Sequence, residues 1–144
     1  MGVPARLLQS VSHMTNEEIE KLIGQAQEAM KTAYVPYSKF PVGAAFLMED
    51  GEVITGCNIE NASFGATICA ERTAVAKAMS DGVRKIKAIA VSNTTETKIT
   101  PCGICRQVIY EFGRDVPIIC SNKDGDYVIR SIQELLPDAF TLED

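Results

Sequence analysis

The amino-acid sequence predicts an α/β fold of three layers, α/β/α, in which helices cover both faces of a central mixed β-sheet. The chain has 144 residues, a length that corresponds to one domain with one packed core. Hydrophobic residues make up 46% and charged residues 23% of the chain, as in ordinary globular proteins and unlike disordered ones. Segments with helix and strand patterns alternate in the order α β β α β α β β α, which favours helices on both faces of one sheet.

The first predicted elements are a helix and a β-hairpin. The helix begins at a capping box formed by Thr15 and Glu18, and apolar residues then recur at helical spacing until Pro36, which cannot continue a helix. A loop is expected to follow. Residues 42–48 and 53–57 have strand character and flank a turn that contains Asp-Gly, so they predict two antiparallel strands joined by that turn.

The rest of the chain alternates between segments rich in helix formers and short apolar segments. Gly82 and Gly113 follow the two helical segments, at a position where helices commonly end. The expected elements, in chain order, are helix 69–80, strand 86–91, helix 102–112, strands 116–120 and 127–130, and a short helix that begins at the capping box 131–134.

Residues 1–14 show no strong periodicity, so we expect a flexible N-terminal extension followed by a single domain of residues 15–144. His13, the one histidine of the chain, lies in this extension. No apolar run approaches the ~20 residues that a membrane-spanning helix needs, and the first residues have no apolar core of signal-peptide length. We therefore expect a cytoplasmic protein with no membrane partner.

The charge balance argues against nucleic acid as a partner. The chain has 14 Lys and Arg against 19 Asp and Glu, which gives a formal net charge of −5. Proteins that bind nucleic acid by neutralising its phosphates usually have a basic excess instead. The short basic run within residues 84–87 is expected to be a solvated strand end.

The five cysteines direct attention to metal or redox chemistry, because an odd set in a reducing compartment rarely serves disulfides. Cys102 and Cys105 form a C-x-x-C pattern in the expected first turn of a helix, where unpaired backbone N–H groups favour thiolates. Taken alone, this pattern fits either a thioredoxin-type redox dithiol or half of a zinc site. Cys57 and Cys120 have apolar neighbours at strand ends and are expected to be small packed residues rather than ligands.

Cys69 offers a third thiol, because it also opens a predicted helix after a polar loop. Helix ends of this kind converge on one edge of an α/β sheet, so the three cysteines are expected to form a tetrahedral zinc site with one open position. An open position is typical of catalytic zinc, which lowers the pKa of bound water towards ~7. Glu71, two residues after Cys69, is placed to take and return protons there. These parts fit a hydrolytic deamination.

A cationic side chain is also available near this site. Three thiolates and Zn²⁺ sum to a charge of −1, so such a site needs positive charge around it. Arg72 follows Cys69 by three residues, about one helical turn, and is expected to donate a hydrogen bond to a ligand sulfur. That bond would reduce electron donation to the zinc and keep it acidic. The alternative is a surface arginine with no role in the site.

Four sequence blocks together resemble the small, homotetrameric cytidine deaminases. They are C-N-I-E-N-A from Cys57, C-A-E-R-T-A from Cys69, P-C-G-I-C-R-Q from Pro101 and E-L-L-P from Glu134. The resemblance extends from about Thr15 to Phe140. A lone C-x-x-C is weak evidence, but C-A-E followed by P-C-x-x-C in a chain of this length is specific for zinc deaminases.

The resemblance implies a cytidine deaminase-like fold and one Zn²⁺ per chain, held by Cys69, Cys102 and Cys105. Glu71 would protonate N3 of the pyrimidine, assist attack of zinc-bound hydroxide at C4, and pass a proton to the departing ammonia. Cytidine would become uridine, and 2′-deoxycytidine would become 2′-deoxyuridine. The implied enzyme is a hydrolase acting on the C–N bond of a cyclic amidine, with a place in pyrimidine salvage.

The resemblance also implies contacts with the substrate. Asn58 and Glu60 match the family's pair that hydrogen-bonds the ribose hydroxyl, which favours a free nucleoside over a bare base. Phe40 matches the aromatic side chain that packs on the pyrimidine, and the main-chain N–H of Ala70 would bind the base carbonyl. Phe140 matches a C-terminal Phe that reaches the site of a neighbouring subunit, so a homotetramer with shared sites is expected.

One residue departs from the family pattern: many members carry Tyr where this chain has Phe64, so any contact made by that hydroxyl is missing here. Other functions stay open from the sequence. The net charge opposes a deaminase of RNA or DNA bases, and only the family pattern opposes a deaminase of a nucleoside antibiotic. A redox protein would form a reversible disulfide and bind no metal. A non-catalytic zinc module would close the fourth position and be indifferent to Glu71.

Overall fold

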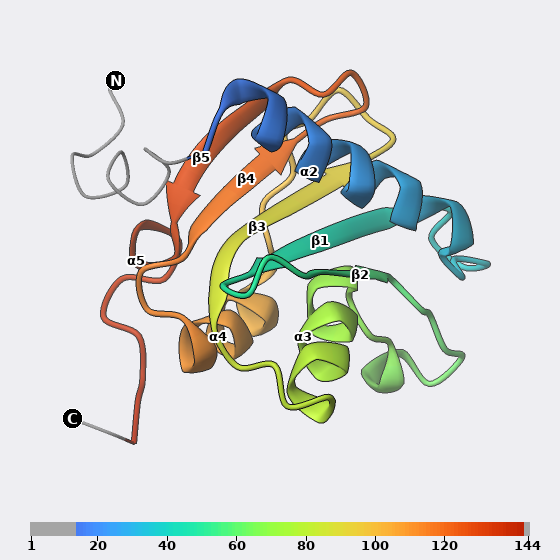
Figure 1. Ribbon diagram of the computed structural model, residues 1–144. Helices are drawn as coiled ribbons and strands as arrows, with labels where there is room; N and C mark the ends of the chain where they lie inside the picture. The colour runs from blue at the N-terminus through green and yellow to red at the C-terminus, as the bar shows by residue number, and fades with distance from the viewer. Residues whose placement is uncertain (1–13, 143–144) are drawn as a thin grey trace.

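The computed structural model describes residues 14–142, which form a five-stranded mixed sheet with helices on both of its faces (Figure 1). The strand order is β2-β1-β3-β4-β5, in which β3 and β4 run parallel and the other neighbouring strands run antiparallel. The strands are β1 (Val42–Met48), β2 (Val53–Cys57), β3 (Ile86–Asn93), β4 (Pro117–Ser121) and β5 (Tyr127–Ser131). The helices are α2 (Asn16–Ala29), α3 (Ala70–Ser80), α4 (Gly103–Phe112) and α5 (Ile132–Leu135), with short 3₁₀ turns at Met30–Thr32 and Phe64–Ala66. The predicted three-layer α/β/α fold is confirmed.

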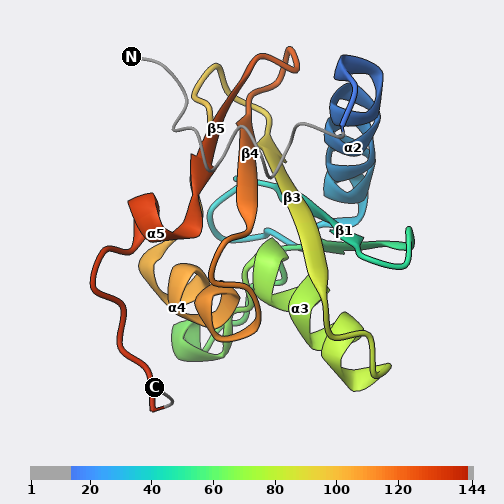
Figure 2. The same ribbon diagram turned by 60° about the vertical axis from the view of Figure 1, so that its left-hand side comes forward.

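The two faces of the sheet carry different side chains and different helices. Small residues of the central strands pack with α2, among them Ala45 of β1 and Ala88 and Ala90 of β3. Residues that alternate with them, such as Phe46 and Ile89, belong to a second cluster with α3 and α4. Figure 2 shows the same division, with α2 on one side of the sheet and α3 and α4 on the other. Strand alternation therefore places one helical layer on each face.

Helix α2 begins as predicted but ends earlier. Its capping box is formed, since the Glu18 N–H donates to Thr15 Oγ1 (3.1 Å) and the Thr15 N–H donates to Glu18 Oε1 (3.4 Å). The apolar spacing predicted a helix up to Pro36, whereas the chain leaves the helical path before Tyr34. Tyr34 pairs instead with Ile59 in an isolated parallel β-bridge, which requires extended backbone. This contact between distant segments overrides the local helical pattern.

The remaining predicted elements are confirmed, with shifts of one or two residues at their ends. Met14 was assigned to the N-terminal extension, but its side chain is only 8% exposed and packs in the core beneath α2. Residues 1–13 and 143–144, and with them His13, lie outside the described residues, so the division into extension and domain stays a prediction. Within residues 14–142, no helix is long and apolar enough to cross a membrane.

Two strand glycines allow the helices to lie close to the sheet. A Cβ on Gly43 of β1 would lie 1.9 Å from the carbonyl oxygen of Ala26 in α2. A Cβ on Gly56 of β2 would lie 2.5 Å from the carbonyl oxygen of Ala70 in α3. Both neighbours are backbone atoms, so a side chain at either position would displace a whole helix. Gly56 thereby fixes where the first turn of α3 lies against the sheet.

We expect Gly43→Ala to lower the free energy of unfolding by about 3 kcal/mol, because the added methyl group overpacks the interface between α2 and β1. Gly24→Ala is a matched control, since a Cβ on Gly24 in α2 would meet no atom within 4 Å. The control should keep or raise stability, by about 0.5–1 kcal/mol, because Ala is the better helix former. Urea unfolding followed by circular dichroism measures both variants. Equal stability of the two would contradict the close approach of α2.

Candidate active site

Cysteines lie at the N-terminal ends of two helices on the same side of the sheet. Cys69 is the N-cap residue of α3, Cys102 is the N-cap residue of α4, and Cys105 lies in the first turn of α4. Neither N-cap side chain bonds to a backbone N–H of its own helix, so both sulfur atoms are available to a ligand. The partial positive charge of the two helix N-termini stabilises thiolates at these positions.

The three sulfur atoms are spaced as ligands of one metal ion. Cys69 Sγ lies 3.7 Å from Cys102 Sγ, and Cys102 Sγ lies 3.4 Å from Cys105 Sγ. All three lie within 4.8 Å of one another. In a tetrahedral thiolate site, Zn–S bonds of about 2.3 Å place the sulfurs about 3.8 Å apart. The geometry and the soft donors both fit zinc, as the sequence predicted.

Arg72 lies beside this cluster. Its Nη2 donates to Cys69 Sγ at 3.5 Å and to the carbonyl oxygen of Thr67 at 3.3 Å, so the predicted hydrogen bond to a ligand sulfur is present. Hydrogen bonds from the Cys105 thiol and from Arg72 lower the pKa of Cys69 to about 5. The same hydrogen bond to Cys69, followed by burial, raises the pKa of Cys105. The Arg72 guanidinium therefore stabilises a thiolate at Cys69.

Glu71 is a buried acid next to the thiols. It is the second residue of α3, and its side chain is only 5% exposed. Burial raises the pKa of the Glu71 carboxyl to about 7, with a further contribution from the charge of Cys69. A carboxyl group with this pKa both gives and accepts protons near neutral pH, which suits a general acid and base.

A cavity of about 270 Å³ brings the predicted residues together. This volume is near the lower end of the range for small-molecule pockets. The predicted residues that line it are Phe40, Asn58, Glu60, Cys69, Ala70, Glu71 and Cys102. Ser38, Val42, Ile99 and Thr100 also line it, and the sequence analysis did not identify them as site residues. For Ser38, the one available signal was its place two residues before Phe40 in the same loop.

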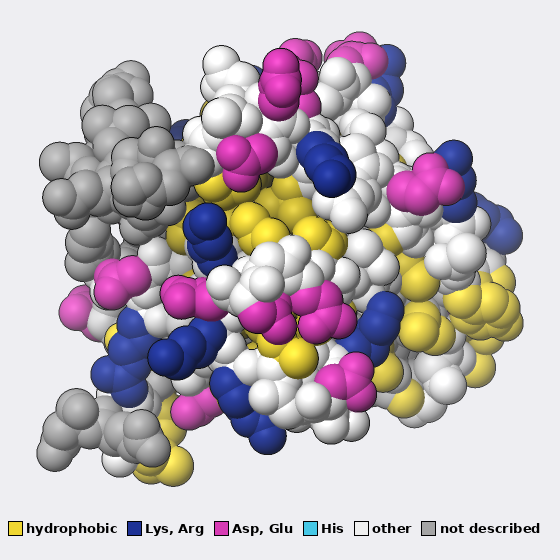
Figure 3. Space-filling view, viewed as in Figure 1, with side chains coloured by type: hydrophobic (Ala, Val, Ile, Leu, Met, Phe, Trp, Pro, Cys, Tyr) yellow, Lys and Arg dark blue, Asp and Glu magenta, His cyan; other side chains and the backbone are white. Residues whose placement is uncertain are grey.

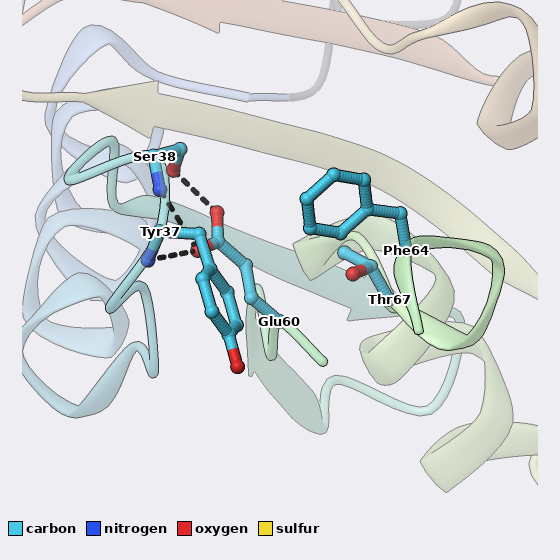
Figure 4. Close-up of a pocket in the computed structure, with 5 residues that line it drawn as sticks. All are labelled: Tyr37, Ser38, Glu60, Phe64 and Thr67. Carbon is cyan, nitrogen blue, oxygen red and sulfur yellow. Dashed lines mark hydrogen bonds between the residues drawn. The ribbon is translucent and has the colours of Figure 1, made fainter. Parts of the chain in front are cut away.

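Asn58 and Glu60 are held by the loop that carries Phe40. Asn58 Nδ2 donates to the carbonyl oxygen of Phe40 (2.8 Å), and Asn58 Oδ1 accepts from the Val42 N–H (2.9 Å). Figure 4 shows the Glu60 carboxylate facing the backbone and the hydroxyl of Ser38, with dashed lines to both. The hydrogen bond from the Ser38 hydroxyl is the main reason that the pKa of Glu60 is lowered. Glu60 is therefore a carboxylate at neutral pH.

A second cavity of about 420 Å³ adjoins the first and is also lined by Glu60. Its lining includes Tyr37 and Phe64, whose rings meet edge to face with centroids 6.0 Å apart (Figure 4). Phe64 offers only a hydrocarbon ring to this space, in line with the departure noted in the sequence. Ser38 and Glu60 line both cavities and connect them.

Phe140 and the other two cysteines lie outside the three-thiol cluster. Phe140 is 68% exposed and does not line either cavity of its own chain; its carbonyl oxygen accepts a hydrogen bond from Gln107 Nε2 (3.0 Å). Cys57 accepts a hydrogen bond from the Thr32 hydroxyl (3.7 Å), and Cys120 is buried in the core, where burial raises its pKa to about 12. Neither of these two cysteines belongs to the three-thiol cluster.

Comparisons with known proteins agree with this geometry. Residues 16–120 match the family model described as the cytidine and deoxycytidylate deaminase zinc-binding region. A curated cytidine deaminase from Sporosarcina psychrophila is 54% identical over 128 residues, which cover 88% of this chain and 94% of the relative. A crystal structure of cytidine deaminase from Burkholderia pseudomallei has a TM-score of 0.82 and 47% identity, and the match covers 88% of this chain and 100% of that one. A crystal structure of cytidine deaminase from Mycobacterium tuberculosis has a TM-score of 0.75 and 44% identity, covering 85% and 96% of the two chains. Because the family match spans most of the chain and includes the thiol cluster and Glu71, the protein belongs to the cytidine and deoxycytidylate deaminase family.

Proposed function

We propose that the protein catalyses the hydrolytic deamination of free cytidine and 2′-deoxycytidine to uridine and 2′-deoxyuridine, as an enzyme of pyrimidine salvage. One observation carries the proposal: the buried carboxyl group of Glu71 lies with two of the three clustered thiols in a cavity of small-molecule size. The relatives named cytidine deaminase support the choice of substrate. The cytoplasmic location expected from the sequence stays a prediction.

Cys69, Cys102 and Cys105 would hold the zinc ion, one per chain. Bound there, zinc would supply an acidified water as a nucleophile at neutral pH. Arg72 would offset the negative charge of the thiolates, because its guanidinium donates to Cys69 Sγ. That hydrogen bond would withdraw electron density from the sulfur and so keep a bound zinc ion a stronger Lewis acid.

The first turn of α3 provides both the proton carrier and a donor for the base. Glu71 would take a proton from the attacking water and deliver it to N3 of the pyrimidine. It would then take the second proton from the hydroxyl group added at C4 and give it to the leaving amine. One water is consumed and one ammonia released for each cytidine. The N–H of Ala70 has no partner within its helix because it is the first residue of α3, so it is free to donate to the base carbonyl.

The loop before β1 and the segment after β2 would contribute further contacts to the nucleoside. Phe40 would pack against the pyrimidine, and Asn58 and Glu60 would bind the ribose hydroxyl. The net charge of −5 supports a free nucleoside over a nucleic acid. The Asn58 amide already bonds to the backbone on both sides of Pro41, so it also sets the position of Phe40.

We further propose that the protein is a homotetramer in which Phe140 reaches the site of a neighbouring subunit. Its ring is exposed and lies outside the cavity of its own chain, as a residue that serves a neighbour would be. An apolar patch supports self-association; its members are Tyr34, Tyr37, Ile59, Phe64 and Ile68, all exposed. Figure 3 shows hydrophobic atoms gathered at the right of the view, over the loops that follow α2 and β2, and a second hydrophobic area at the centre with charges of both signs around it. Exposed apolar patches of this kind mark interaction surfaces.

The proton role of Glu71 is tested by Glu71→Gln, which removes the titratable group and keeps the shape of the side chain. We expect kcat for cytidine to fall by roughly 10²–10⁴-fold while the zinc content and the fold stay unchanged. Ultraviolet absorbance measures conversion of cytidine to uridine directly. Glu111→Gln makes the same change at an exposed position of α4 and should leave turnover intact. Substantial activity in Glu71→Gln would show that the shuttle assignment is wrong.

The zinc assignment is tested by Cys102→Ala. This variant should lose bound zinc, measured by metal analysis per chain, and its Tm should fall by roughly 5 °C or more because metal binding contributes folding free energy. Cys57→Ala is the control, since the Cys57 thiol is not part of the cluster and its removal should leave the zinc content at one per chain. Unchanged zinc in Cys102→Ala would remove Cys102 from the ligand set.

The shared site is tested by Phe140→Ala. We expect KM for cytidine to rise roughly tenfold because the lost ring no longer covers the neighbouring cavity, while zinc content stays the same. Leu142→Ala removes another exposed apolar side chain from the same segment and should have little effect. Sedimentation should give the mass of a tetramer. A fully active monomer would refute the role of Phe140.

A further inference from the structure

The carboxylate of Glu60 has one open acceptor position. Oε1 accepts two backbone hydrogen bonds, from the Tyr37 N–H (3.0 Å) and the Ser38 N–H (3.1 Å). Oε2 accepts one hydrogen bond, from the Ser38 hydroxyl (Figure 4). A carboxylate oxygen offers about two acceptor positions. Oε1 is therefore filled, and Oε2 is the oxygen with room for a hydroxyl group of a ligand.

The orientation of the Ser38 hydroxyl is fixed from both sides. Its oxygen accepts a hydrogen bond from the Phe40 N–H (3.0 Å), and its single proton points to Glu60 Oε2. A serine hydroxyl has one proton to donate, so Ser38 cannot serve Glu60 and donate to another group at the same time. The hydroxyl group therefore connects the backbone of Phe40 to Glu60 Oε2, the carboxylate oxygen that can still accept a hydrogen bond from a ligand.

Ser38 lies in contact with both parts of the proposed substrate site. It lines the cavity together with Phe40 and Glu60, and its hydroxyl group is hydrogen-bonded to both of these residues. Lys39, between Ser38 and Phe40, has a positive φ of 58°, so the loop bends sharply there and returns the Phe40 N–H to the Ser38 hydroxyl. One side chain thus couples the aromatic group that would pack on the base to the carboxylate that would bind the sugar.

We propose that Ser38 is a positioning residue that aims Glu60 Oε2 at the 3′-hydroxyl of the nucleoside and so makes the enzyme selective for substrates that carry this hydroxyl. The inference rests on the proposed function of the site. In this proposal, Ser38 affects substrate binding only through its hydrogen bond to Glu60. Without the Ser38 hydroxyl, Oε2 loses its protein partner, and the carboxylate is held by its Oε1 contacts alone, about which it can turn.

The test compares Ser38→Ala with the unaltered enzyme on two substrates, cytidine and 3′-deoxycytidine, with the zinc-loaded full chain. For cytidine, we expect kcat/KM to fall roughly 10- to 100-fold, mainly through KM, because a hydrogen bond to a charged acceptor loses its fixed geometry. For 3′-deoxycytidine, which has no hydroxyl to place, we expect a change of less than about threefold. Ser38→Thr keeps the hydroxyl and should restore most of the lost selectivity. Ser80→Ala, at the far end of α3, makes the same kind of change away from the site and should alter neither substrate.

The outcomes separate this inference from the function on which it rests. An equal loss on both substrates in Ser38→Ala, without rescue by Ser38→Thr, would show that Ser38 only supports the loop, and the positioning role would be overturned. Failure of the unaltered enzyme to convert either substrate would overturn the proposed function itself, and the inference with it. A loss confined to cytidine and reversed by Ser38→Thr supports both.

Discussion

The site depends on the fact that α3 and α4 start at the same end of the sheet. Short turns connect α3 to β3 and α4 to β4, so each helix runs in the opposite direction to the strand that follows it. Because β3 and β4 are parallel, the two helices are parallel to each other and their N-termini lie together. The thiols, the acid and the free N–H groups of the site all come from these two first turns. If β3 and β4 were antiparallel, the same sequence motifs would lie at opposite ends of the molecule.

Polar contacts behind the cavity hold the cysteines in this arrangement. Arg106 follows Cys105 in α4, and its guanidinium donates in three directions: to the carbonyl oxygen of Pro101 (2.7 Å), to that of Leu135 (2.7 Å) and to the Thr100 hydroxyl (3.1 Å). The segment that leads into α4 is thereby tied to α4 itself and to the end of α5. Only a planar group with several donors makes all three contacts at once. The cysteines that would hold zinc are thus positioned by hydrogen bonds within the protein.

The sequence predicts the parts of the structure that local patterns determine. Its predictions are wrong or incomplete where contacts between distant segments determine the structure. Both capping boxes, the hairpin and the cysteine cluster were predicted because each depends on a few neighbouring residues or on a family motif. The predicted position of the end of α2 was wrong because the β-bridge between Tyr34 and Ile59 joins segments that are far apart in the chain. Ser38 was missed for the same reason. Its hydroxyl group contributes to the site through a hydrogen bond to Glu60, and no spacing pattern in the sequence indicates that these two distant residues are in contact.

The charges around the cavity bear on the choice between nucleoside and nucleotide, which the family description leaves open. Among the described residues that line the cavity there is no lysine or arginine, while Glu60, Glu71 and two thiols are present. Arg72 already donates to Cys69 Sγ, and Arg106 is used behind the site. Lys39, in the loop between Ser38 and Phe40, does not line the cavity, but its charge helps to lower the pKa of Glu60. A phosphate carries up to two negative charges and would meet the Glu60 carboxylate, whose pKa is lowered, in a cavity whose described lining offers no guanidinium or ammonium group. A neutral nucleoside has no such cost. The electrostatics of the cavity therefore favour the proposed nucleoside substrates over their phosphates.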